Sequence, residues 1–349
     1  MSLKDRLKAE IAQSGPIGVD AFMARCLHDP ADGYYATRPA IGEVGDFITA
    51  PMVSQMFGEL IGLWLAQAWA DAGGPPRALL VEGGPGDGTL MSDILRAARL
   101  APGFLEACEL WLVETSPPLR ARQAERLAAA KPRWAALLAE LPTDAPLFFI
   151  ANELLDCLPA RQFQHTEQGW AERVVGLGPD GELSFGLRPA AGCFPAAPPA
   201  AVIERSAAQT AFVAELASRI VDQGGAALLI DYGGVEAEPG DTLQALLGHQ
   251  RVDPLTTAGQ ADLTVQVDFS AVLDAARSAG AQAAVTTQGA FLRRLGIEAR
   301  AERLIAAQPS RAATIARQLE RLMAPDQMGE LFKVAAIWAG EPPTGFDAR

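Results

Sequence analysis

Cysteine and histidine are scarce in this chain of 349 residues, which contains four cysteines and three histidines. The cysteines, Cys26, Cys108, Cys157 and Cys193, lie far apart, and the sequence has no CxxC or HxxxH spacing. This pattern is typical of neither a disulfide framework nor a zinc site. The sequence therefore predicts no metal centre and a reduced, cytoplasmic setting.

Positively charged residues are fewer than negatively charged ones, and long apolar runs are absent from the sequence. Lys and Arg number 29 against 42 Asp and Glu, which gives a formal net charge of -13 and a pI near 4.8. This charge repels phosphate backbones, so we expect no nucleic-acid partner. No run of about 18 uninterrupted apolar residues occurs, and residues 1–15 form a charged amphipathic segment without an apolar h-region. We therefore expect no membrane insertion and no export signal.

Apolar residues are abundant, at 49% of the chain, so a sizeable core can be buried. At about 150 residues per domain, the length suggests two domains or one α/β core with large insertions. We expect residues 1–75 to form helices and a long Gly-, Pro- and Asp-rich loop that pack on this core. This part ends with a helix over 52–68, where apolar residues recur at spacings of three and four.

Short apolar segments typical of strands alternate with amphipathic segments typical of helices in the middle of the chain. The expected strands cover residues 78–81, 110–113, 147–151 and 226–230. This alternation predicts a mostly parallel sheet with helices on both faces, which is the α/β class. Residues 76–160 and 221–290 should form the two parts of this core.

Two segments interrupt the alternation. Residues 161–220 should form an antiparallel hairpin over 161–185, followed by an Ala- and Pro-rich linker. Residues 291–330 should form a helical insertion whose arginines and glutamates make a solvated face. The remaining segment, 331–349, should contribute a final strand over 332–338, which could add to the sheet edge, and a tail.

A glycine-rich loop joins the first expected core strand to the helix after it. In order, the loop contains Glu82, Gly83, Gly84, Pro85, Gly86, Asp87 and Gly88. Glycine permits backbone angles and a close ligand approach that a Cβ would block. The spacing departs from the GxGxxG of dinucleotide-binding folds. The carboxylate of Glu82 would repel an anion but attract the amino and sulfonium groups of S-adenosylmethionine.

The second expected core strand ends at Glu114, where a carboxylate can accept hydrogen bonds from both hydroxyls of a ribose. NAD enzymes use the same arrangement, so Glu114 alone leaves a nicotinamide or flavin cofactor open, and the loop alone could be a tight turn without a ligand. Together they favour S-adenosylmethionine. The expected cofactor-binding residues are Glu82, Gly83, Gly84, Pro85, Gly86, Gly88, Thr89, Glu114 and Asn152.

Three polar residues follow the buried strand at 147–151, namely Asn152, Glu153 and Asp156. In open α/β sheets the carboxyl ends of the strands line the ligand crevice, so these side chains either face the site or cap the next helix. Three polar groups exceed what one cap needs, which favours a functional role. Cys157 and His165 fit better as a buried thiol and an exposed hairpin histidine than as catalytic groups.

Several segments, in order from about residue 33 to 338, resemble the MidA-like family. They are 45–51 with 54–59, 82–90, 152–159, 231–233, 261–264 with 267–269, and 328–330 before 332–334. The chain departs from the family pattern at Met52, where a glutamate is common, and at Gly83, where a leucine is common. Met52 therefore supplies no carboxylate for a substrate contact at that position.

This resemblance implies a Rossmann-like class I methyltransferase sheet with an N-terminal helical cap, a β-hairpin insertion and a late helical insertion. It implies S-adenosyl-L-methionine as cofactor and a protein arginine as methyl acceptor, because mitochondrial members are protein arginine methyltransferases needed for respiratory complex I assembly. The expected target is the quinone-site 49 kDa subunit of complex I or its bacterial counterpart. A bacterial-type chain would act in the cytoplasm, and eukaryotic members act in the mitochondrial matrix.

A guanidinium stays protonated in water and must be oriented by carboxylates. The expected catalytic residues are Glu153 and Asp156, with Asp46 in the long loop as a third and Asp231 and Tyr232 lining the neighbouring strand end. Two alternatives remain open at this point. One is an assembly chaperone that binds S-adenosylmethionine without turnover, and the other is an NAD(P)- or flavin-dependent oxidoreductase.

Overall fold

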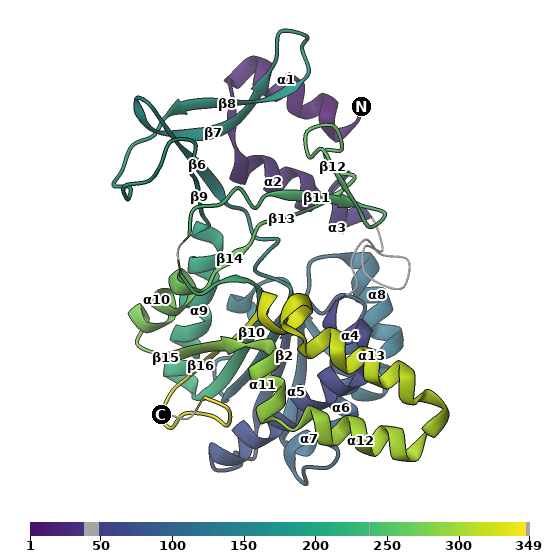
Figure 1. The fold of residues 1–349 in the computed structure, drawn as a ribbon. Coiled ribbons are helices and arrows are strands. Elements are labelled where there is room, and N and C mark those ends of the chain that lie inside the picture. The colour runs from purple at the N-terminus through teal and green to yellow at the C-terminus, as the bar shows by residue number, and fades with distance from the viewer. Residues whose placement is uncertain (38–48, 237, 347–349) are drawn as a thin grey trace.

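The computed structural model describes residues 1–37, 49–236 and 238–346. A sheet flanked by helices forms the lower part of the molecule in Figure 1, and two small sheets with the N-terminal helices form the upper part. The expected catalytic residue Asp46 lies outside the described residues. None of the helices in the described part is long and apolar enough to cross a membrane.

The central sheet has the strand order β15-β16-β10-β5-β2-β3-β4, with the short β14 pairing with β10. Its strands are β2 (Ala78–Gly83), β3 (Cys108–Val113), β4 (Arg133–Ala135), β5 (Leu147–Asn152), β10 (Gly225–Gly234), β14 (Val267–Asp268), β15 (Gln282–Thr287) and β16 (Phe332–Trp338). The ladders from β10 through β5, β2 and β3 to β4 are all parallel. The carboxyl ends of these strands therefore meet at one edge of the sheet, which faces the upper part of the molecule (Figure 1).

The last strand, β16, has a different position in the sheet from the expected one. β16 was expected at the sheet edge, but it lies between β10 and β15 and is antiparallel to both. An apolar run that is buried along almost its whole length needs a covered, interior position, and β16 has that pattern. The edge is formed by β15, most of which is only partly buried.

Helices cover both faces of the sheet. One face carries α4 (Ala50–Val53), α5 (Gln55–Asp71), α6 (Thr89–Ala98), α7 (Phe104–Ala107), α8 (Pro117–Arg126) and the 3-10 turn η1 (Ala128–Ala130). The other carries α9 (Ala207–Gln223), α10 (Phe269–Ser278) and the 3-10 turn η2 (Leu138–Glu140). Alternate strand residues serve the two faces, so that Leu80 packs with α5 whereas Leu79 packs with α9.

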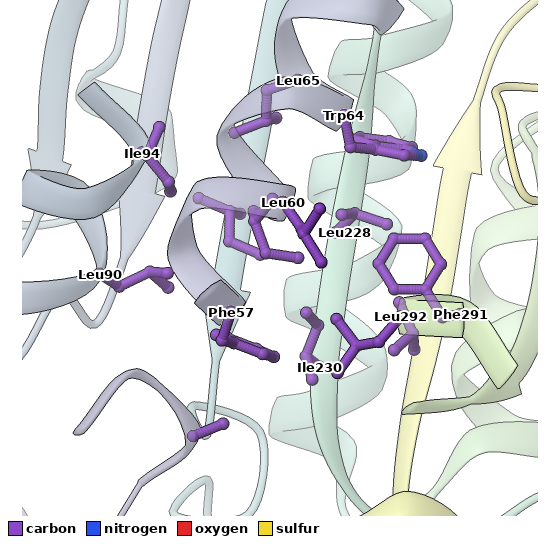
Figure 2. Close-up of a cluster of buried hydrophobic side chains, with 14 of the residues drawn as sticks. Phe57, Leu60, Trp64, Leu65, Leu90, Ile94, Leu228, Ile230, Phe291 and Leu292 are labelled. Carbon is purple, nitrogen blue, oxygen red and sulfur yellow. The ribbon is translucent and has the colours of Figure 1, made fainter. Parts of the chain in front are cut away.

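A cluster of large apolar side chains joins α5 to the sheet and to the helical insertion. The side chains labelled in Figure 2 are Phe57, Leu60, Trp64 and Leu65 of α5, Leu90 and Ile94 of α6, Leu228 and Ile230 of β10, and Phe291 and Leu292. Each fully buried side chain of this size contributes about 1.5–3 kcal/mol. The cluster thus fixes α5 and the strand β10 that carries part of the site.

The late insertion is helical, as expected, and contains α11 (Gln288–Arg294), α12 (Ile297–Ala307), the 3-10 turn η3 (Pro309–Arg311), α13 (Ala312–Met323) and the π-helical turn η4 (Pro325–Gly329). Arg293, Arg294 and Arg303 are exposed, which agrees with a solvated face. The opposite face is not solvated, because Ile297 and Leu322 are buried against the core. Arg300 is also partly buried and donates from Nε to Glu59 Oε2 of α5 at 2.8 Å.

The upper part combines the N-terminus with the two other sheets. Its helices are α1 (Leu3–Ser14), α2 (Val19–His28) and α3 (Tyr34–Thr37). One sheet contains β1 (Ile17–Gly18), β6 (Arg161–Thr166), β7 (Gly169–Leu177), β8 (Leu183–Pro189) and β9 (Val202–Arg205), and the other contains β11 (Gln244–Leu247), β12 (Gln250–Val252) and β13 (Asp262–Thr264). The hairpin expected over 161–185 is present as β6 and β7. The range 161–220 also supplies β8, β9 and most of α9, and α9 packs on the core sheet rather than forming part of a linker.

Candidate functional site

The glycine loop between β2 and α6 has the backbone that its composition predicts. Gly84, Gly86 and Gly88 have positive φ angles of 62°, 54° and 84°, in the left-handed region that only glycine adopts without strain. A Cβ on Gly84 would lie 2.9 Å from Leu154 Cδ1, and one on Gly83 would lie 2.6 Å from Phe149 Cζ. The loop therefore presents bare backbone at the carboxyl end of β2.

A small cavity lies against this loop. Its lining consists of Thr49, Pro51, Met52, Glu82, Gly84, Pro85, Gly86, Asp87, Thr89, Leu90, Asn152 and Glu153. It holds about 50 Å³, space for one end of a cofactor rather than for the whole molecule. The structure thus brings together most of the expected cofactor-binding residues, whereas Gly83, Gly88 and Glu114 do not form part of this lining.

Glu82 is the acidic group of the cavity. It is 2% exposed, and its Oε2 has no hydrogen-bond partner among the described residues. Burial, followed by the charges of Asp87 and Glu114, raises the pKa of the Glu82 carboxyl to about 8. A buried oxygen without a partner is costly unless a ligand satisfies it. A positively charged donor such as an ammonium group would do so and would favour the ionised form.

Glu114 is connected to the glycine loop by a glutamine that no sequence pattern had indicated. Gln123, on α8, is 0% exposed and donates from Nε2 to Gly86 O at 2.7 Å and to Glu114 Oε2 at 3.2 Å. Trp134 Nε1 donates to Gln123 Oε1 at 2.8 Å. The other oxygen of Glu114 accepts from Ser116 N at 2.7 Å. A carboxylate has about four lone-pair sites, so Glu114 retains capacity for ribose hydroxyls.

Glu153 occupies the turn directly after β5. Its φ of 54° is unusual for a residue other than glycine, and such strain is often retained at functional sites. Asn152 Nδ2 donates to Glu153 Oε1 at 2.8 Å, and Ala50 N donates to the same oxygen at 3.4 Å. Burial, together with the neighbouring charge of Asp156, raises the pKa of Glu153 to about 8.

A second, larger cavity shares Glu153 with the first. It holds about 630 Å³, within the usual range of ligand-binding cavities. Its lining comes from β10, β11, β12, β16, η4 and the segments beside them, and consists of Glu153, Tyr232, Asp241, Thr242, Leu243, Gln244, Arg251, Gln266, Arg321, Asp326, Gln327, Met328, Leu331 and Phe332. Glu153 lines both this cavity and the small one at the glycine loop.

Asp156, the other expected catalytic acid, lines neither cavity. It is 6% exposed, and Tyr232 Oη donates to its Oδ2 at 2.8 Å. Burial raises the pKa of Asp156 to about 6, although the hydrogen bond from Tyr232 lowers it. Asp231 is also enclosed, and its carboxylate accepts from the backbone N–H groups of Leu155, Asp156 and Tyr232. Of these residues, Tyr232 is the one that lines a cavity.

The two less favoured candidates have ordinary surroundings. The Cys157 thiol is buried and donates to Leu154 O at 3.1 Å. His165 is partly exposed on the β6–β7 hairpin and lies beside Trp170. Within the described residues, no cluster of three or more His, Cys, Asp or Glu side chains could hold a metal ion.

Comparisons with known proteins show the family of this chain. Over residues 60–287 the sequence matches the model of a family described as "Putative S-adenosyl-L-methionine-dependent methyltransferase". The chain belongs to this family. It is 36% identical to the mouse protein arginine methyltransferase NDUFAF7, mitochondrial, over 95% of this chain and 83% of the relative. The human protein of that name is 34% identical, with 95% and 82% of the two chains covered.

A solved structure is similar over nearly the whole of this methyltransferase. It is that of a Burkholderia thailandensis protein bound to S-adenosyl-homocysteine, and it covers 99% of this chain and 92% of its own, at 30% identity and a TM-score of 0.86. The mixed sheet with β16 antiparallel inside it is therefore that of a class I methyltransferase. The chain is an S-adenosyl-L-methionine-dependent methyltransferase of the MidA/NDUFAF7-like type.

The residues of the site fit this cofactor. Bound S-adenosylmethionine supplies a methyl group on a positively charged sulfur. The unpartnered Glu82 Oε2 suits a cationic group, and the bare backbone at Gly84 and Gly86 allows close approach. Glu114, fixed by Gln123, suits the ribose hydroxyls.

Proposed function

We propose that this methyltransferase transfers the methyl group to an arginine of a protein substrate. The observation that carries the proposal is the position of Glu153, which lines both the cavity at the glycine loop and the 630 Å³ cavity beyond it. We assign the first cavity to the cofactor and the second to the acceptor side chain. In this proposal, the Glu153 carboxylate between the two cavities holds the guanidinium for the transfer.

The chemistry of the acceptor supports this assignment. Methyl transfer is an in-line displacement, so the protein's main tasks are to position and desolvate the nucleophile. A guanidinium has a pKa of about 12.5 or above and a planar fork of donors, and it needs carboxylates for orientation. Glu153 supplies one at the junction, and Asp326 lines the same cavity, whereas Asp241 in that lining already accepts from Arg173 at 2.7 Å.

We infer that Glu82, Gly84, Pro85, Gly86, Thr89, Glu114 and Asn152 hold the cofactor. For the substrate we propose the quinone-site 49 kDa subunit of respiratory complex I or its bacterial counterpart, which follows from the resemblance to the MidA-like family. Relatives that are 34–36% identical carry the name of protein arginine methyltransferases, which supports an arginine acceptor. The net charge of -13 suits a basic partner protein.

Mass spectrometry of complex I tests the proposal. Complex I is purified from a strain without this chain and from its parent, and arginine methylation is compared on every subunit. We expect one methylated arginine on the 49 kDa-type subunit in the parent and none in the deletion strain. Incubation of the unmethylated subunit with the purified chain and methyl-labelled cofactor should restore the mark. No difference between the strains would overturn the arginine proposal, and binding of the cofactor without any transfer would favour an assembly chaperone.

A further inference from the structure

Tyr232 stands between a buried carboxylate and the acceptor cavity. Tyr232 lines the 630 Å³ cavity together with Glu153, whereas Asp156 is buried and lines neither this cavity nor the one at the glycine loop. The hydroxyl of Tyr232 donates to Asp156 Oδ2 at 2.8 Å. A phenolic hydroxyl both donates and accepts. Tyr232 can therefore accept a hydrogen bond from a group in the cavity while it donates to Asp156.

The backbone holds these two side chains in place. Asp231 Oδ1 accepts from Tyr232 N at 2.9 Å, and Asp231 Oδ2 accepts from Leu155 N at 2.9 Å and from Asp156 N at 3.2 Å. One buried carboxylate thus ties the end of β10 to the turn that carries Asp156. The Tyr232 ring also packs edge-on against Phe332 of β16, with 5.6 Å between the ring centroids. The Tyr232–Asp156 pair is therefore preorganised by the Asp231 carboxylate and the Phe332 ring.

The proposed reaction requires a group that accepts a proton from the substrate. A protonated guanidinium has no free lone pair on nitrogen, so one N–H proton must leave for each methyl group that the nitrogen receives. Glu153 Oε1 already accepts from Asn152 and Ala50, which suits Glu153 to orient the cation. The proton still needs a second group at the cavity, with an acceptor behind it.

Building on the proposed function, we propose that Tyr232 relays this proton from the substrate guanidinium to Asp156. The guanidinium proton passes to Tyr232 Oη while the hydroxyl proton of Tyr232 passes to Asp156 Oδ2. The freed nitrogen lone pair forms the N–C bond to the methyl carbon, and the electron pair of the breaking C–S bond stays on sulfur. Asp156 changes from an anion to a neutral acid, and the product guanidinium again carries one positive charge.

The surroundings of Asp156 favour it as the group that receives the proton. Its Oδ1 has no hydrogen-bond partner among the described residues, so the ionised form is poorly stabilised and gains by taking a proton. With a pKa raised to about 6 by burial, Asp156 is still ionised at neutral pH. The other titratable groups that interact with this cluster are Glu153, Asp231, Cys157, Tyr35 and Asp262. Tyr35 donates to Asp262 at 2.9 Å, so Asp262 already has a partner of its own.

Tyr232→Phe tests the relay, because it keeps the ring against Phe332 and removes only the hydroxyl. Tyr35→Phe is the matched control, since it removes a tyrosine hydroxyl from the same buried cluster without changing the lining of the acceptor cavity. The assay uses the unmethylated 49 kDa-type subunit and S-adenosylmethionine. We expect Tyr232→Phe to lower kcat by about 10²-fold, with unchanged S-adenosyl-homocysteine affinity and a lower Tm, because Asp156 Oδ2 loses its donor. The kcat of the parent should rise with pH through about 6. Tyr35→Phe should keep that rise and the parental kcat, and Tyr232→Phe and Asp156→Asn should lose the rise.

A spectroscopic measurement tests the pair without turnover. The chain has three tyrosines, so protein labelled with ¹³C at tyrosine Cζ gives three signals, and the one missing in Tyr232→Phe is that of Tyr232. This signal should titrate with Asp156 near pH 6 and should lose that titration in Asp156→Asn. A parental kcat in Tyr232→Phe, or a Tyr232 signal that does not change as Asp156 titrates, overturns the relay. Either result leaves the proposed function in place. A parent protein that methylates no arginine overturns the proposed function and the relay with it.

Discussion

The Glu82 carboxyl combines complete burial with an oxygen that has no partner in the described part of the chain. Its pKa is raised from 4.5 to about 8, chiefly by burial. The folded protein therefore binds a proton that the unfolded chain has released between these pH values, and the free energy of unfolding should fall as pH rises from about 4.5 to about 8. Without cofactor, the folded protein favours the protonated carboxyl of Glu82 over the ionised carboxylate.

Glu82→Gln should therefore stabilise the cofactor-free protein above pH 8 and weaken its function. We expect the free energy of unfolding at alkaline pH to rise by up to about 5 kcal/mol, since the pKa shift from 4.5 to about 8 is about 3.5 units and each unit corresponds to about 1.4 kcal/mol. Urea unfolding at pH 5 and pH 8.5 measures the change, and calorimetric titration with S-adenosylmethionine should show weaker binding. If the variant keeps the parental pH dependence of unfolding and the parental cofactor affinity, Glu82 does not bind the cofactor.

Glu153→Gln keeps the shape of the side chain and an oxygen that can accept from Asn152 and Ala50. We expect near-normal cofactor affinity and a turnover about 10²-fold lower, on the scale of other electrostatic catalytic groups. Glu153 ionises as pH rises through about 8, so the KM of the parent for the protein substrate should fall over that range. The variant should lose this dependence. If Glu153→Gln and Asp156→Asn both methylate at the parental rate, these two residues have a structural role and not a catalytic one.

Residue types alone could select Glu82, Glu114 and Glu153 as candidate site residues, because each follows an expected strand at the end where ligands bind. They could not separate Glu153 from Asp156, since a polar side chain after a strand can point into the cavity or beneath it. The burial of Asp156 depends on Tyr232, which is 76 residues away along the chain. Gln123 gave no signal for the same reason, because its partners come from three other segments.

At the scale of elements, Gln123 makes α8 a support for the glycine loop. Gln123→Leu has a similar volume but removes the hydrogen bonds to Gly86 and Glu114 and leaves Trp134 Nε1 without its acceptor. We expect cofactor binding to weaken by about 1–3 kcal/mol, the usual loss when buried partners are left unsatisfied. Gln67→Leu on the exposed side of α5 is the control. Equal affinities in the two variants, measured by calorimetric titration, would contradict the supporting role.

The helical insertion is held to α5 by charge as well as by apolar packing. Glu59 is 9% exposed and accepts from Arg300 of α12 at 2.8 Å and from Arg96 of α6 at 3.3 Å. Arg300→Met leaves Glu59 with one arginine, so we expect a loss of about 1–2 kcal/mol, between the values for exposed and buried pairs. Urea unfolding and limited proteolysis of the insertion measure it. Arg303→Met, at an exposed position of the same helix, should change little, and an equal loss there would refute the anchor.

For the whole molecule, apolar periodicity and glycine positions were enough to predict an α/β core, its strands β2, β3, β5 and β10, and the β6–β7 hairpin. They were not enough for strand order. An apolar run such as 332–338 predicts a buried strand but does not say which strands flank it. β15 was missed because most of its residues are only partly buried and several are polar. Tertiary pairing decided both cases.

The interior position of β16 has a consequence for how the chain is made. β10 and β15 both hydrogen-bond to β16 along their lengths, yet β16 is translated after both of them. Until residue 338 has left the ribosome, these two strands present open edges, which attract pairing with other chains. Tyr232 also lacks its contact with Phe332 during that interval. A nascent chain stalled before residue 332 should therefore depend on chaperones and should not methylate until its translation resumes.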